Sequence, residues 1–92
     1  MVDNNNKLEV NDIDDIKKIF KSNSKILVEV VEQDKNDEYF KYNFFALGFA
    51  GISNDFDGNK NLVFKVLEAN YDFISVKLKE SLNNIAFYSS FG

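Results

Sequence analysis

The sequence lacks five kinds of side chain on which many protein sites depend. It has no His, Cys, Arg, Trp or Pro among its 92 residues. Without His no imidazole titrates near neutral pH, and without Cys there is no thiolate nucleophile and no disulfide. Without Arg no guanidinium can grip a phosphate through two hydrogen bonds. These absences argue against an enzyme and against a bound cofactor, although an AT-rich genome favours the same composition.

Charge and length narrow the class of protein further. Asp and Glu number 15 against 11 Lys, and the net charge of −4 disfavours direct binding to nucleic acid or to an anionic membrane. No apolar run approaches the roughly 18 residues of a membrane span, and no signal-peptide pattern follows Met1. We therefore expect a cytoplasmic single domain over residues 1–92, monomeric or homodimeric, with residues 1–10 as a flexible polar tail.

A helical pattern spans residues 12–22. Acidic side chains lie at its start and Lys residues lie at its end, as the helix dipole favours. The apolar residues recur at helical spacing and form one stripe: Ile13, Ile16, Ile19 and Phe20. The sequence therefore predicts one N-terminal helix that packs this stripe on the rest of the domain.

After Ser24 the apolar period changes from 3.6 residues to two, which indicates strands. Residues 85–91 fit a last strand, with a C-terminal helix as the alternative. The connections between strands are too short for parallel pairing. Strands are predicted over residues 26–31, 39–49, 62–68 and 71–78, with polar turns at 34–37, 53–61, 69–70 and 81–84.

The predicted fold class is α+β. It is an N-terminal helix followed by a four- or five-stranded antiparallel meander, either open or curled into a small barrel. The inward-facing positions of these elements predict a core of eight residues: Ile16, Ile19, Val28, Phe44, Phe64, Val66, Ile74 and Val76.

The polar segment 55–61 is the only stretch that suggests a metal. Asp55, Asp57, Asn59 and Asn61 place an oxygen on every second residue, as calcium-binding loops do. The bidentate Glu of such a loop is missing, because Val66 occupies that position, and Lys60 adds a positive charge. A solvated hairpin loop with an Asp-Gly turn is the preferred interpretation, and no metal is predicted.

The aromatic share of 15% is high, and a small core does not hold every ring. Exposed rings beside turns are typical of contacts with a partner protein. The predicted partner-binding residues are three rings and the acidic residues around two of them, which suit a basic partner surface: Tyr39, Phe56, Tyr88, Asp34, Asp37, Glu38, Asp55 and Asp57.

The predicted function is a small acidic module that binds another protein without catalysis. Inhibitors, immunity proteins and accessory proteins of phages or mobile elements are of this kind. The alternative is a subunit of an Sm-like or SH3-like barrel that oligomerises and binds RNA or a small ligand. The Asp-x-x-Met-Asn and Arg-Gly elements of Sm proteins are missing, so the alternative depends on the order of helix and strands alone.

Overall fold

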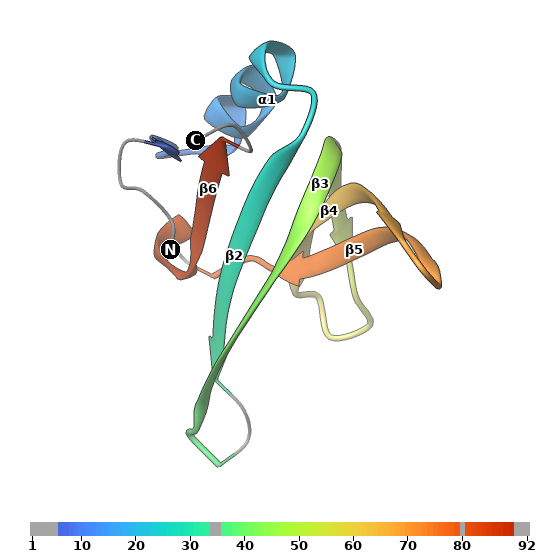
Figure 1. Cartoon of the computed structure of the whole chain (residues 1–92). Helices are drawn as coiled ribbons and strands as arrows, with labels where there is room; N and C mark the ends of the chain where they lie inside the picture. Colours follow the sequence, from blue (N-terminus) through green and yellow to red (C-terminus); the bar gives the residue numbers. More distant parts are fainter. Residues whose placement is uncertain (1–5, 34–35, 80, 90–92) are drawn as a thin grey trace.

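The computed structural model describes residues 6–33, 36–79 and 81–89, which form a small α+β domain. Its described elements are one α-helix, a short 3₁₀ helix and a six-stranded antiparallel sheet (Figure 1). They are, in chain order, β1 (Lys7–Leu8), α1 (Ile13–Ser22), β2 (Ile26–Gln33), β3 (Tyr39–Asn54), β4 (Lys60–Glu68), β5 (Tyr71–Lys77), η2 (Leu82–Asn84) and β6 (Ile85–Ser89).

Helix α1 confirms the prediction for residues 12–22. Asp12 is its N-cap, and the Asp12 side chain accepts a hydrogen bond of 2.9 Å from the Asp15 backbone N–H. The Asp15 carboxylate in turn accepts one of 3.0 Å from the Asn11 backbone N–H. This reciprocal pair satisfies N–H groups that no helical carbonyl reaches, so the local sequence determines where the helix begins.

The order of strands in the sheet is β1-β6-β2-β3-β4-β5. Strands β2 to β5 form the predicted meander, but β6 does not extend it. Instead β6 pairs with the free side of β2, and β1 pairs with β6. The prediction of an N-terminal helix and a polar tail over residues 1–10 is therefore wrong for residues 7–8, which form a strand before the helix. Residues 1–5 lie outside the described part of the chain.

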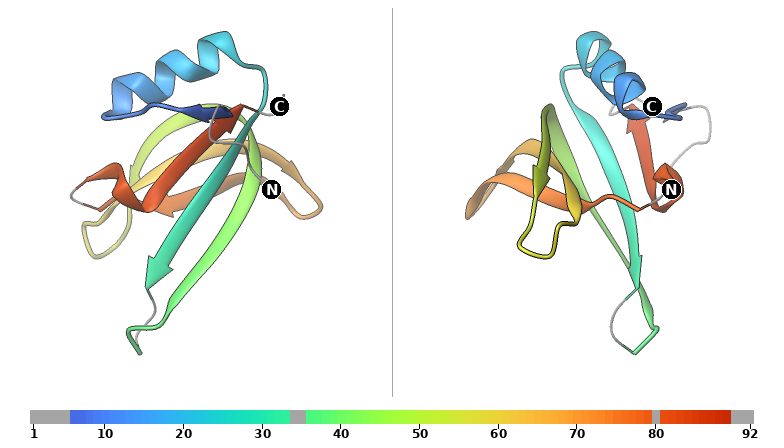
Figure 2. Two further views of the ribbon diagram at one scale, coloured as in Figure 1. Left: turned by 60° about the vertical axis from the view of Figure 1, so that its left-hand side comes forward. Right: turned by 180° about the vertical axis from the view of Figure 1, so that it is seen from behind.

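The sheet curls strongly but does not close into a barrel (Figure 2). Much of the curl lies in β3, which runs beyond the predicted residue 49 to Asn54. Its register with β4 shifts between Ala46 and Gly48 and again between Phe49 and Gly51, so β3 carries two bulges. Gly51 has a φ of 124°, which side chains rarely tolerate. Bulges bend a strand and increase its twist, which explains the curl.

The hydrophobic core lies inside the curl, and α1 lies across one end of it (Figure 2). Phe64 is fully buried at its centre, and four other rings surround it. Their centroids lie 5.4 to 6.2 Å from that of Phe64: Phe20, Phe44, Phe49 and Phe87. Such tilted contacts add to the stabilisation that burial of the rings provides.

Six of the eight predicted core residues are buried, and Ile19 and Ile74 are only half-buried. Ile74 lies in the edge strand β5, where no further strand covers it. Of the strand predicted over residues 85–91, residues 85–89 form β6, and residues 90–91 lie outside the described part of the chain. The alternative helix is reduced to the single 3₁₀ turn η2. The buried hydrophobic residues that the pattern did not single out are Ile26, Val30, Ala46, Leu62, Ile85 and Phe87, and one polar residue, Asn84, is also buried.

Candidate interaction surface

The hairpin of β2 and β3 extends beyond the strands on either side of it. Strand β6 pairs with β2 only from Ile26 to Val30, and β4 pairs with β3 only from Ala46 onward. Residues 31–33 and 36–41 therefore form a two-stranded ribbon that projects from the domain (Figure 1, lower end). We call this ribbon the arm.

The arm presents aromatic side chains to solvent on both of its faces. Tyr39 is 72% exposed and Phe40 is 46% exposed, and neighbouring residues of a strand point to opposite faces. Phe40 stacks on Tyr42 with centroids 6.1 Å apart, and Tyr42 stacks on the buried Phe44 at 6.4 Å. A ladder of rings thus connects the exposed arm to the core and holds it in place.

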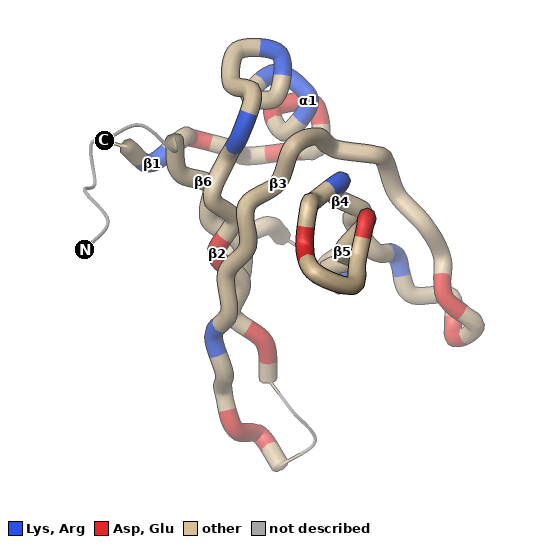
Figure 3. Tube along the Cα trace, turned by 45° about the vertical axis from the view of Figure 1, so that its right-hand side comes forward, with Lys and Arg blue, Asp and Glu red and all other residues tan. Residues whose placement is uncertain are grey.

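Carboxylates surround these rings. Glu32 lies opposite Phe40 in the register of the two strands, and Asp37 and Glu38 lie just before Tyr39. Lys41 is the one Lys on the described arm, and its ammonium lies 3.7 Å from the Glu29 carboxylate. Acidic segments accordingly mark the end of the arm in Figure 3. The arm therefore combines apolar rings with a negative field.

Two hydrogen-bonding arrangements shape the arm. The Tyr42 hydroxyl donates a bond of 3.0 Å to the Glu32 carboxylate. Burial raises the pKa of Tyr42 well above its usual value, and the bond to Glu32 and the charge of Glu32 raise it further. At the tip, Asp37 has a φ of 62°, and its carboxylate accepts a bond of 3.3 Å from the Gln33 amide. Asp is one of the few residues that tolerate this conformation.

The predicted partner-binding residues do not form one surface. Tyr39, Asp37 and Glu38 lie on the arm, and Asp34 lies outside the described residues. Asp55, Phe56 and Asp57 lie at the opposite end of β3, in the loop before β4, where Phe56 is fully exposed. Tyr88 lies in the inner strand β6, between Lys7 and Leu27 of the neighbouring strands, and is half-buried. The structure brings together only the residues around Tyr39.

The loop before β4 is organised by Asp55 itself. One oxygen of its carboxylate accepts backbone hydrogen bonds from Asn59 at 2.9 Å and Asp57 at 3.0 Å. The bond from the Asn59 backbone is the main reason that the pKa of Asp55 is lowered. These bonds form the turn that the sequence predicts in this loop. Within the described residues, no group of three or more acidic side chains is placed to hold a metal ion.

The sequence pattern missed a second group of exposed apolar side chains, around the hairpin of β4 and β5. Leu67, Tyr71 and Phe73 are 79%, 62% and 53% exposed. The turn at residues 69–70 lies directly before Tyr71. The rule that favoured rings beside turns would therefore have identified Tyr71 as exposed. The exposure of Phe73 follows from the place of β5 at the edge of the sheet, which sequence spacing does not reveal.

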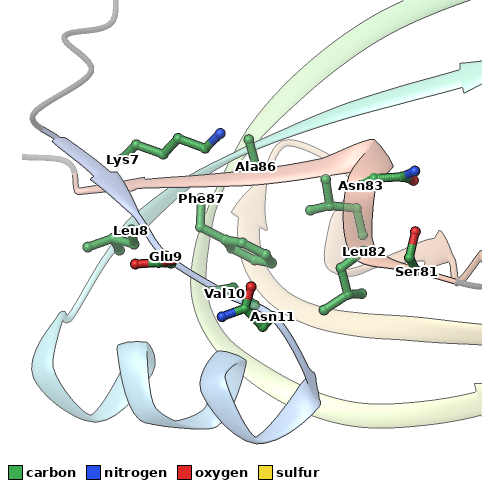
Figure 4. Close-up of a pocket in the computed structure, with 11 residues that line it drawn as sticks. Lys7, Leu8, Glu9, Val10, Asn11, Ser81, Leu82, Asn83, Ala86 and Phe87 are labelled. Carbon is green, nitrogen blue, oxygen red and sulfur yellow. The ribbon is translucent and has the colours of Figure 1, made fainter.

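A pocket of about 490 Å³ lies between β1, the segment that follows it, η2 and β6 (Figure 4). The apolar residues of its lining are Leu8, Val10, Leu82, Ile85, Ala86 and Phe87. The charged groups in its lining are Lys7 and Glu9, and its other polar side chains are amides and the hydroxyl of Ser81.

Comparisons of the chain with protein-family models, with curated proteins and with solved structures found no match. No helix in the described part of the chain is long and apolar enough to cross a membrane. The geometry of the surface is therefore the basis on which a function is inferred.

Proposed function

We propose that this protein is a small binding module that uses its arm to dock on a basic surface of another protein. An inhibitor, an immunity protein or an accessory protein of a phage or mobile element acts in this way. The observation that carries the proposal is the exposure of Tyr39 and Phe40 on a projecting ribbon whose end is acidic. Phe56 and Tyr88 lie away from this ribbon and are left out of the proposed surface.

The physical roles of the two kinds of side chain differ. Tyr and Phe rings bury much apolar area at a small cost in side-chain entropy, and they are frequent among the residues that dominate binding energy. The carboxylates of Glu32, Asp37 and Glu38 attract a basic partner over a distance, which speeds association more than it strengthens the complex. A two-stranded ribbon is only marginally stable by itself. The ring contacts at the base of the arm are therefore needed to hold it in place.

Affinity capture from the native host, followed by quantitative mass spectrometry, tests the proposal. The wild-type chain is compared with the double variant Tyr39→Ala/Phe40→Ala and with Phe56→Ala, which removes an exposed ring outside the arm. We expect a basic protein that wild type and Phe56→Ala retain and that the double variant loses. With that protein purified, the double variant should bind at least about tenfold more weakly, as truncated anchor residues do.

A variant without the negative charge of the arm separates long-range electrostatic attraction from direct contact with the partner. Glu32→Gln/Asp37→Asn/Glu38→Gln keeps the shape of the arm and removes its negative charge. We expect a slower association rate and a weaker dependence of that rate on salt, with a smaller change in dissociation. The proposal fails if no captured protein distinguishes the double variant from wild type, or if removal of these charges leaves the association rate unchanged.

A further inference from the structure

Within the described part of the chain, strand β5 is an open edge of the sheet. It ends the strand order, and seven residues, Tyr71–Lys77, run along this edge. The opposite edge, β1, has only two residues. A long unprotected edge strand is a template for pairing with another chain, and most proteins shorten or cover such edges. Beside this edge lie the exposed side chains of Leu67, Tyr71 and Phe73.

The hydrogen bonds show which backbone groups of β5 face outward. The Leu78 N–H donates to the Lys60 carbonyl at 2.9 Å, and Lys77 lies opposite Asn61. Bonded and non-bonded pairs alternate along an antiparallel ladder, so the even-numbered residues of β5 bond to β4. The register shifts between Lys65 and Glu68, and up to that shift the odd-numbered residues direct their N–H and C=O groups away from β4: Phe73, Ser75 and Lys77.

The charges along β5 select the direction of a partner strand. The start of the strand is acidic, with Asp72 and the nearby Glu68, and its end is basic, with Lys77 and Lys79. When two copies of β5 pair antiparallel, the acidic end of each lies beside the basic end of the other. A parallel pair places like charges together, which is unfavourable. The edge is therefore complementary to itself.

We propose that β5 pairs antiparallel with β5 of a second copy of this chain, forming a homodimer with one continuous sheet. Full overlap of the two strands places the two-fold axis at Ile74, so the outward groups of Phe73 meet those of Ser75 in the other copy. Tyr71 then lies opposite Lys77, and the two Phe73 rings lie close to the axis on the same face. This interface is separate from the arm, so the dimer leaves both arms available.

Mass in solution tests the proposal. The molar mass of the wild-type chain is measured by sedimentation equilibrium from about 1 µM to about 1 mM, the range in which weak complexes dissociate. We expect it to rise from the 10.6 kDa of one chain toward twice that value. Ser75→Pro removes an outward N–H without breaking a bond to β4, and edge strands tolerate Pro in this position. This variant should remain monomeric at concentrations where wild type is dimeric.

A second variant guards against an effect of Pro on folding. Phe73→Asp places two carboxylates near the two-fold axis and should also abolish the dimer. Phe56→Asp makes the same change outside the interface and should leave the dimer intact. Amide hydrogen exchange locates the contact. The N–H groups of Phe73 and Ser75 should become protected as the dimer forms. A mass of one chain throughout the range, a dimer unchanged in Phe73→Asp, or a dimer without this protection overturns the proposal.

Discussion

The Tyr42 hydroxyl donates a hydrogen bond of 3.0 Å to the Glu32 carboxylate across the hairpin of β2 and β3. The bond lies at the base of the arm, where the last strand neighbour on the β2 side ends at Val30. It joins the half-buried ring of Tyr42, which stacks on the buried Phe44, to an acidic side chain of the exposed ribbon. The bond therefore couples the position of the arm to the core.

This bond predicts how stability depends on alkaline pH. The pKa of Tyr42 is raised in the folded protein, chiefly by burial and then by Glu32. Above the ordinary Tyr pKa of about 10, the unfolded chain loses the Tyr42 proton while the folded chain keeps it. The contribution of Tyr42 to stability is therefore complete below about pH 10 and is lost as the pH rises further. Urea titrations of wild type and Tyr42→Phe should diverge below pH 10 and converge above it, and parallel curves would contradict this account.

Phe64 should be the residue whose truncation costs most stability. It is fully buried and contacts four other rings. Phe64→Ala leaves a large cavity among them and should lower the free energy of unfolding by roughly 3–5 kcal/mol. Phe56→Ala, at a fully exposed position, should change it by less than about 0.5 kcal/mol. Chemical denaturation measures both, and similar losses would mean that the core is not centred on Phe64.

The start of α1 should be sensitive to Asp12 in particular. Asp12→Ala removes the side-chain bond to the Asp15 N–H and should cost about 1 kcal/mol. Asp12→Asn keeps an acceptor and should preserve most of this stability. Asp14→Ala removes a nearby charge but leaves the Asp12 cap in place. Thermal unfolding should therefore show a smaller loss of stability for this variant than for Asp12→Ala. An equal loss in the Asp12 and Asp14 variants would refute the capping role.

Asn84 should be replaceable with a gain in stability. It is buried, and neither polar atom of its side chain has a hydrogen-bond partner within the described part of the protein. Asn84→Leu keeps the branched shape and removes the cost of burying an unsatisfied amide, so the free energy of unfolding should increase by about 1 kcal/mol. Asn83→Leu, in the same turn but exposed, is the control and should give no gain. Destabilisation by Asn84→Leu would show that the amide has a structural role.

The sequence by itself determined the local elements. The spacing of Ile13, Ile16 and Phe20 and the acidic residues at the start specified the helix to within one residue, because capping and the helical stripe are local properties. Alternation of period two identified the strands β2 to β6. Asp55, Gly58 and the surrounding polar residues indicated the turn between β3 and β4.

Only the tertiary structure decided how these elements join and what they expose. Strand β6 pairs with β2 because both bury one apolar face in the same core, and the two residues of β1 become a strand only because β6 is beside them. The arm exists because β2 and β3 pair with each other beyond the residues at which β6 and β4 pair with them. Phe73 is exposed because β5 ends the sheet. These relations depend on contacts between residues far apart in the chain, which neither local propensity nor periodicity encodes.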